Sequence, residues 1–178
     1  GLNLVVHKGK TIFVADTSVH EYPSSEEMSE IAISSARVVR LFGFDPKVAF
    51  VSHSTFGQPL TNRTKHIKKA VDILKEKKVD FEFDGDMQPD VALNEDYKDL
   101  YPFSKIVGNA NILIMPGQHS AAISYKMLKT LGDTKVIGPL LIGLGLPIEI
   151  VPLRTSTSEI LNLASIAAYS ADKIDYSK

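Results

Sequence analysis

Two aspartates, Asp84 and Asp86, stand on either side of Gly85. Carboxylates this close together can share one proton or hold a cation between them. Turns also favour aspartate and glycine, for reasons of backbone conformation alone. We favour the turn, and expect the pair to lie in the loop that follows a short strand at residues 81–83.

A histidine lies among three hydroxyl side chains, because His53 follows Ser52 and precedes Ser54 and Thr55. Such neighbours suggest a nucleophile beside its general base. Adjacent residues of an extended segment point to opposite faces, so adjacency in the sequence does not bring these groups together. We therefore favour a structural role for this segment, which we expect to form a loop after a strand.

The familiar metal and nucleotide motifs are absent from the sequence. Its histidines lie in separate segments, without the spacing of a metal site: His7, His20, His53, His66 and His119. The chain has no cysteine, which excludes disulfide bonds and thiolate ligands. It has no Walker loop, and residues 143–145 lack the third glycine of a Rossmann site. We expect no metal centre and no nucleotide cofactor of these kinds.

Residues 109–131 join an apolar run to an amphipathic helix through a tight loop. The run at 112–115 does not alternate with polar residues, which is typical of a strand covered on both faces of a parallel sheet. Pro116 and Gly117 end it, and helical spacing of apolar residues follows as far as Gly132. In open α/β sheets such loops lie at the carboxyl ends of strands, where helix N-termini present free N–H groups to anions. The sequence predicts a binding site at that edge.

Strands and helices alternate along the rest of the chain. Apolar segments predict further strands at 4–6, 11–15, 47–52 and 147–151, and glycine and proline break a second apolar run at 136–144. This alternation predicts an α/β fold, a three-layer αβα sandwich around a mostly parallel, twisted sheet. The polar loops that follow residues 52, 83, 116 and 136 are then expected to meet at one edge of the sheet.

Helix starts are marked by local capping signals. Ser24 with Glu27, and Ser156 with Glu159, form capping boxes. Asn62 is expected to cap a third helix, which runs through residue 78, and a short acidic helix is expected at 90–100. The helix after Ser156 is expected to turn its apolar residues inward, as follows: Ile160, Leu163, Ala164, Ala167 and Ala168.

Length and composition indicate one domain of ordinary size. The 178 residues are 44% hydrophobic and carry a formal net charge of −1, which argues against a dedicated nucleic-acid binder. No apolar run approaches the roughly 20 residues that span a bilayer. With no cysteine, the composition fits a reducing compartment, so we expect a cytoplasmic protein. From its charge and its short apolar runs, we expect neither a nucleic-acid partner nor a membrane. The chain starts without methionine, and we expect it to be part of something longer.

Five segments, in this order, resemble the phosphate acetyl/butyryltransferase family, and the resemblance covers essentially the whole chain. They include Ala-Asp-Thr-Ser-Val-His-Glu-Tyr-Pro and Gly-Pro-Leu-Leu-Ile-Gly-Leu, and they lie at 15–23, 52–57, 84–93, 108–116 and 138–144. Within the family, Phe56-Gly57, Asp86-Met87-Gln88 and the stretch 125–132 are most similar to the module at the C-terminus of bacterial NADP-dependent malic enzymes.

The resemblance implies a two-lobed fold, also found in isocitrate and isopropylmalate dehydrogenases, with acyl-CoA bound between the lobes. Residues 1–178 would form the C-terminal part of this unit, and the final helix, 156–176, would pack on a first lobe that this chain lacks. The resemblance and the loops together predict a set of residues that bind acyl-CoA or phosphate. They are Ser54, Thr55, Gly57, Asp84, Gln88, Gly117, Gln118, Ser120, Gly138, Pro139, Arg154 and Glu159.

Several positions depart from the active acyltransferases. Those enzymes carry Pro-Asp and then Asn-Ile-Gly-Tyr where this chain has Pro116-Gly117 and residues 122–125 read Ala-Ile-Ser-Tyr. Before the final helix they carry a Ser-Arg pair, which aligns here with Pro152 and Leu153, one residue before Arg154. Glu159 falls at the family's catalytic aspartate, although its capping box explains it equally well. We therefore expect no catalytic residue in this chain.

The resemblance implies an acetyl-CoA-sensing regulatory and oligomerisation domain of an NADP-dependent malic enzyme, which oxidatively decarboxylates malate to pyruvate. One alternative is a fragment of an active phosphate acyltransferase, and another is an oligomeric scaffold without a ligand. Acetyl-CoA would be the effector, and NADP and a divalent metal would belong only to the absent catalytic region. The partners implied are the rest of the parent enzyme and a second copy of the chain.

Overall fold

The computed structural model describes residues 1–173, apart from the side chain of Lys98. The last five residues of the predicted domain, and residues 174–176 of the predicted final helix, lie outside this range. Within it, no helix combines the length and the apolar character needed to cross a bilayer.

Six strands form one sheet in the order β4-β3-β5-β2-β1-β6. The strands are β1 (Leu2–His7), β2 (Lys10–Ala15), β3 (Lys47–Val51), β4 (Glu82–Met87), β5 (Ile112–Ile114) and β6 (Thr134–Leu140). The strands β4, β3, β5 and β2 are parallel to their neighbours, whereas β1 is antiparallel to both β2 and β6. The prediction of a mostly parallel sheet is confirmed. The prediction that 112–115 forms a central strand is also confirmed, because β5 lies between β3 and β2 and is buried.

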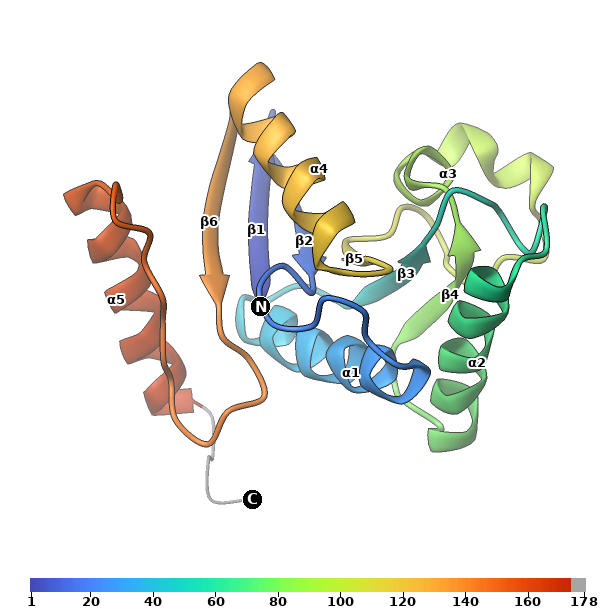
Figure 1. The fold of residues 1–178 in the computed structure, drawn as a ribbon, viewed down its shortest axis with the longest axis horizontal. Coiled ribbons are helices and arrows are strands. Elements are labelled where there is room, and N and C mark those ends of the chain that lie inside the picture. The colour runs from blue at the N-terminus through green and yellow to red at the C-terminus, as the bar shows by residue number, and fades with distance from the viewer. Residues whose placement is uncertain (174–178) are drawn as a thin grey trace.

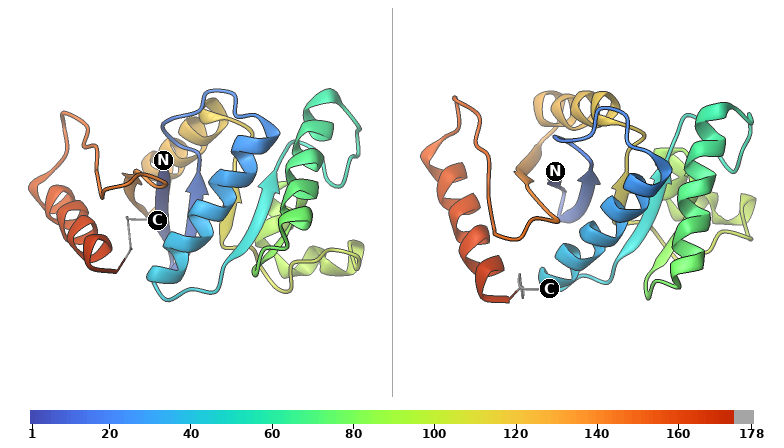
Figure 2. Two further views of the ribbon diagram at one scale, coloured as in Figure 1. Left: turned by 90° about the horizontal axis from the view of Figure 1, so that it is seen from below. Right: turned by 60° about the horizontal axis from the view of Figure 1, so that its bottom comes forward.

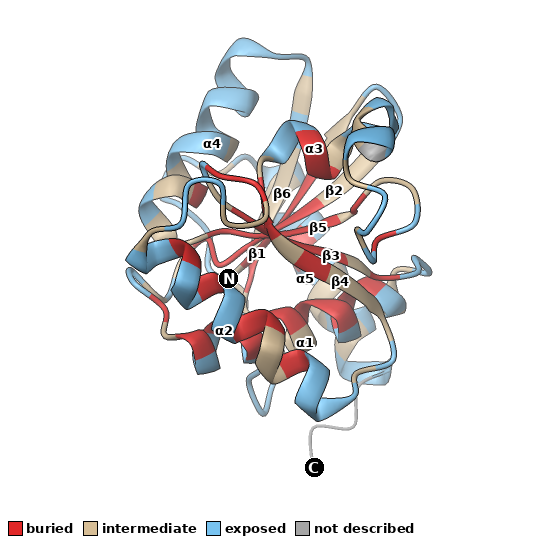
Figure 3. Cartoon of the chain, turned by 90° about the vertical axis from the view of Figure 1, so that its right-hand side faces the viewer, coloured by how far each residue is buried: buried red, intermediate tan, exposed pale blue. Residues whose placement is uncertain are grey.

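Helices cover both faces of the sheet (Figures 1 and 2). They are α1 (Ser25–Leu41), α2 (Asn62–Lys77), α3 (Pro89–Leu93), α4 (Gln118–Leu131) and α5 (Thr157–Lys173), with a 3-10 helix η1 (Glu95–Leu100) after α3. Figure 3 shows α1 and α2 on one face and α3 and α4 on the other. Each face has its own apolar cluster, one around Phe13 and Phe50 and one around Val51 and Met87. The predicted three-layer architecture is confirmed.

Local capping signals are mostly correct. The Ser24 hydroxyl accepts the N–H of Glu27 at 3.1 Å, and the Glu27 carboxylate accepts the N–H of Ser24 at 2.6 Å. The cap of α2 was misplaced by one residue, because Thr61 and not Asn62 caps it through a reciprocal bond with Thr64. The acidic helix predicted at 90–100 is interrupted by Asn94, whose backbone is extended and divides α3 from η1.

Two strand predictions are wrong. Strand β4 continues to Met87, so Asp84 and Asp86 lie within a strand and not in the loop after it. Hydrogen bonds to these two residues come from β3, from the loop after it and from the segment before β5. Such distant contacts cannot be predicted from the neighbouring sequence. Conversely, residues 147–151 form no strand. A single antiparallel bridge, between Leu140 and Glu149, pairs them with β6.

The last two helices are less buried than their patterns predict. In α4 only Ala121 is buried, and Leu131 is 80% exposed. In α5 only Leu163 is buried, so the predicted inward face is wrong for the remaining apolar residues, of which Ile160 is exposed. Figure 1 shows α5 beyond β6 at one end of the molecule, where no other described helix or strand lies outside it.

Candidate functional site

The sheet changes the direction of its connections between β2 and β5. These strands are neighbours and run parallel. The chain leaves β2 towards α1 on one face, and leaves β5 towards α4 on the opposite face (Figure 3). Connections that diverge at the carboxyl ends of adjacent parallel strands open a crevice between them, which is the usual ligand site of an open α/β sheet.

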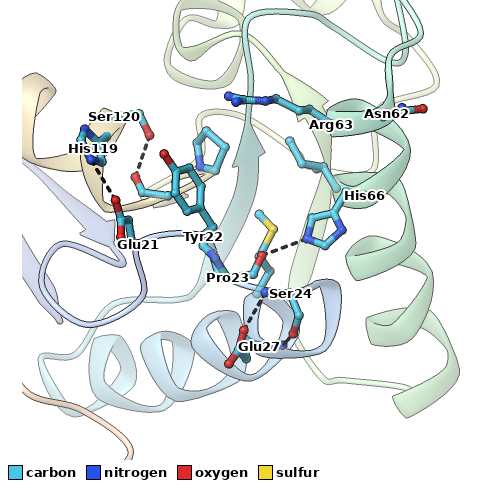
Figure 4. Close-up of a pocket in the computed structure, with 14 residues that line it drawn as sticks. Glu21, Tyr22, Pro23, Ser24, Glu27, Asn62, Arg63, His66, His119 and Ser120 are labelled. Carbon is cyan, nitrogen blue, oxygen red and sulfur yellow. Dashed lines mark hydrogen bonds and ion pairs between the residues drawn. The ribbon is translucent and has the colours of Figure 1, made fainter.

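A cavity of about 620 Å³ lies at this point. Its walls come from the segment before α1 and from the first turns of α1, α2 and α4 (Figure 4). Charged and polar side chains around it include Glu21, Glu27, Arg63, His66, His119 and Ser120. We call this cavity the switch-point cavity.

The N-terminus of α4 contributes backbone N–H groups to one wall of this cavity. Its N-cap residue is Gly117, which has no side chain to cap the helix. The N–H of Gln118 donates to the carbonyl oxygen of His20 at 3.2 Å, and the Ser120 hydroxyl donates to the Gly117 carbonyl oxygen at 2.7 Å. The N–H groups of His119 and Ser120 have no hydrogen-bond partner within residues 1–173. Free N–H groups and the helix dipole favour an anion here.

The first turn of α2 adds positive charge to the opposite wall. No ion pair of Arg63 is found among residues 1–97 and 99–173. The Nε2 atom of His66 lies 2.9 Å from the carbonyl oxygen of Pro23. Because a carbonyl oxygen only accepts, this nitrogen carries a proton. The geometry suits a ligand with at least one anionic group.

Of the sequence-predicted site residues, Gly117 and Ser120 line the switch-point cavity, and Gln118 lies between them. Four others line a separate cavity of about 280 Å³ between α4, β6 and α5: Gly138, Pro139, Arg154 and Glu159. The predicted capping box of Glu159 is confirmed, since its carboxylate accepts the N–H of Ser156 at 2.9 Å. Hydrogen bonds from Ser156 and from Lys129 lower the pKa of Glu159 to about 2.

Gly138 has a packing role in addition to its place on this second cavity. Its φ is +127°, and a Cβ atom there would lie 2.6 Å from Oδ1 of Asn3 and 2.9 Å from the carbonyl oxygen of Leu2. Glycine is therefore required for β6 to approach β1, whether or not a ligand binds nearby.

The remaining predicted residues lie at the ends of β3 and β4 and line neither cavity: Ser54, Thr55, Gly57, Asp84 and Gln88. Hydrogen bonds join the loop after β3 to Asp86 and Gln88 at the end of β4. The Asp86 carboxylate accepts the Ser54 hydroxyl and, at 3.0 Å, the N–H of Gly57. The Thr55 hydroxyl accepts the N–H of Gln88 at 3.2 Å. These contacts make the group a structural link between two strands.

The Asp84 carboxylate accepts the N–H of Lys105 at 2.8 Å and so fixes the chain before β5. Elsewhere, burial raises the pKa of Glu149 to about 7, and its Oε2 atom has no hydrogen-bond partner. Within the part of the chain that the structure describes, no three metal-binding side chains come together.

Sequence reasoning missed most of the switch-point cavity. Arg63 and His66 lie on α2, where the many lysines favour a solvated surface and not a binding site. Glu21 and Tyr22 lie within the segment 15–23 that carries part of the family resemblance, which is the one signal that pointed to them. Their position beside His119 depends on the packing of α4 against this segment.

Comparison with known proteins gives a consistent result. A sequence model described as phosphate acetyl/butaryl transferase matches residues 1–168. The NADP-dependent malic enzyme of Rhizobium meliloti is 46% identical over 96% of this chain, which spans 22% of that protein. The phosphate acetyltransferase of Bacillus subtilis is 33% identical over 94% of this chain and 52% of its own length. A phosphotransacetylase structure from Streptococcus pyogenes superposes with a TM-score of 0.92 at 30% identity, over 98% of this chain and 54% of that one.

Proposed function

Because the chain belongs to the phosphate acetyl/butaryl transferase family, we propose that it is the acetyl-CoA-sensing domain of an NADP-dependent malic enzyme. The chain spans about a fifth of the malic enzymes it matches and about half of the phosphate acetyltransferases. On this proposal, NADP, a divalent metal and the oxidative decarboxylation of malate belong to the rest of the parent chain.

The observation that carries the proposal is the switch-point cavity with its uncapped helix. The free N–H groups at the start of α4 line a cavity that Arg63 also lines, and no described residue forms an ion pair with this arginine. Acetyl-CoA has several phosphate groups, and helix N-termini and arginine are the groups that proteins use most often to bind them. We infer that a phosphate or the thioester oxygen of acetyl-CoA binds at Gly117 to Ser120.

We propose no acyl transfer at the second cavity, between α4, β6 and α5. Leu153 stands where the active enzymes have the arginine of their Ser-Arg pair, and its side chain is fully exposed. Neither Leu153 nor Pro152 has a side-chain donor or acceptor, and a missing donor at a developing charge costs about 10²–10³ in rate. A sensor requires only a difference in affinity between two states of the parent enzyme.

We also propose that α5 packs on a first lobe supplied by the rest of the protein. Only Leu163 of α5 is buried here, while Ile160 and Leu161 are exposed. The solved phosphotransacetylase chains are about twice as long as this one, which leaves room for a second lobe. Apolar residues exposed on a helix at the end of the sheet are the expected surface for it.

A second copy of the protein is expected to cover α4. Its exposed apolar residues form one stripe: Ile123, Met127, Leu128 and Leu131. Changing Met127 to lysine should lower the mass of the assembly in analytical ultracentrifugation, because it places a charge in the centre of this stripe. Leu60→Lys, at another exposed apolar residue, should leave the mass unchanged. An unchanged mass for Met127→Lys would exclude α4 as the interface.

The function is tested on the full-length protein. We expect calorimetric titration with acetyl-CoA to show binding, and the rate of malate oxidation to fall as the site fills. We expect no acetyl phosphate to form from acetyl-CoA and phosphate. Acetyl phosphate above background would favour an active acyltransferase, which the similarity to the Bacillus subtilis enzyme supports. Absence of binding, with malate oxidation unaffected, would leave an oligomeric scaffold.

A further inference from the structure

The segment between β2 and α1 lies directly against the start of α4. The N–H of Gln118 donates to the His20 carbonyl oxygen, and a Cβ atom on Gly117 would lie 2.5 Å from the carbonyl oxygen of Glu21. Backbone atoms therefore pack against backbone atoms with no space between them. This packing places the side chain of Glu21 beside the first turn of α4 (Figure 4).

The carboxylate of Glu21 is the nearest anion to that helix turn. Its Oε1 atom lies 3.3 Å from Nε2 of His119, the second residue of α4. Tyr22 stacks on the same imidazole with ring centroids 6.3 Å apart. The side chains of Glu21 and His119 are 61% and 71% exposed, and a polar contact this exposed contributes little to stability. A ligand can therefore displace the carboxylate without unfolding its surroundings.

Although the helix N-terminus and Arg63 favour an anionic ligand, the carboxylates around the cavity oppose one. Two carboxylates, Glu21 and Glu27, face one guanidinium, that of Arg63. Glu27 is held in the capping box of α1, where hydrogen bonds from Ser24 lower its pKa, so it stays ionised. Glu21 has no such structural role within the described residues. Its removal would therefore change the charge of the cavity without removing a helix cap.

We propose that Glu21 is a built-in competitor for the anionic ligand at the N-terminus of α4, and so sets how tightly that ligand binds. This inference rests on the proposed function, because it concerns the same site. When an anion enters, the Glu21 carboxylate must leave His119, and the imidazole then becomes available to the ligand in addition to the two N–H groups that are already free. The residue lowers affinity and selects for ligands that carry enough negative charge to displace it.

The test compares Glu21→Gln with Glu26→Gln in the full-length protein. Both glutamates are 61% exposed, but Glu26 pairs with Lys69 on the outside of α1 and α2 and does not line the cavity. In calorimetric titrations with acetyl-CoA, and separately with inorganic phosphate, Glu21→Gln should lower the Kd roughly three- to tenfold, as expected for removing a like charge a few ångströms away. Glu26→Gln should leave the Kd unchanged.

The outcomes separate this inference from the proposed function. If the native protein binds acetyl-CoA and Glu21→Gln binds it equally or more weakly, Glu21 does not compete with the ligand. The proposed binding of acetyl-CoA would still hold. If Glu21→Gln binds acetyl-CoA and the native protein does not, the result supports competition by Glu21 strong enough to prevent binding. If neither protein binds acetyl-CoA or phosphate, both proposals are overturned. Unchanged melting temperatures for both variants would show that differences in Kd do not arise from loss of folding.

Discussion

Asp86→Ala is expected to lower the free energy of unfolding by about 3 kcal/mol, because it removes the acceptor of one buried donor, the Ser54 hydroxyl, and of one partly buried donor, the Gly57 N–H. The Asp86 side chain is almost fully buried and accepts both the N–H of Gly57 and the hydroxyl of Ser54. Its own carbonyl oxygen accepts the N–H of Phe56 at 2.6 Å. Asp86 thus holds the loop after β3 to β4 through three hydrogen bonds. Urea denaturation followed by circular dichroism measures the loss.

Two further variants show whether the acceptor or the charge of Asp86 matters. Asp86→Asn keeps one oxygen for the Gly57 N–H and offers an amide to the Ser54 hydroxyl, so it should cost about 1 kcal/mol. Asp133→Ala, at an exposed aspartate after α4, should have an effect within about 0.5 kcal/mol. A loss below 1 kcal/mol for Asp86→Ala would mean that the loop is held by other contacts.

Gly117→Ala is expected to weaken acetyl-CoA binding at least tenfold and to lower stability by about 1–3 kcal/mol. The added Cβ atom would lie 2.5 Å from the carbonyl oxygen of Glu21, and backbone atoms cannot rotate away as a flexible side chain can. Either the start of α4 or the segment before α1 must move. Both line the switch-point cavity, so the proposed ligand groups lose their alignment. Titration calorimetry and thermal unfolding of the full-length protein measure the two effects.

Gly145 provides the matched control, because a Cβ atom there would meet no atom within 4 Å. Gly145→Ala should therefore preserve both the Kd and the melting temperature. Native affinity in Gly117→Ala, with an unchanged melting temperature, would contradict the close packing of Glu21 against Gly117. Loss of stability without loss of affinity would mean that the ligand binds elsewhere in the domain.

Features that depend on a few neighbouring residues could be predicted from the sequence. The capping boxes at Ser24 and Ser156 are confirmed because each joins atoms only three residues apart. The central position of β5 could be predicted as well, since an uninterrupted apolar run is stable only with cover on both faces. The family could also be predicted, because the five segments and their order can be compared with other sequences without a structure.

Tertiary structure decided which segments meet. Asp84 and Asp86 resembled a turn, but β4 pairs with β3 along this stretch, and Lys105, Ser54 and Gly57 supply hydrogen bonds to the two carboxylates. The predicted site residues fell into separate groups because strands that share a carboxyl edge still send their helices to different faces.

The sequence by itself therefore determined the fold class, the capping boxes that start α1 and α5, and the family, all of which rest on local patterns or on segment order. Only the tertiary structure placed Glu21 beside His119 and turned Arg63 towards the same cavity. It also left the apolar face of α4 exposed, although its spacing is that of a buried helix. The physical reason is that helical periodicity defines which residues share a face, whereas burial and charge pairing depend on what packs against that face.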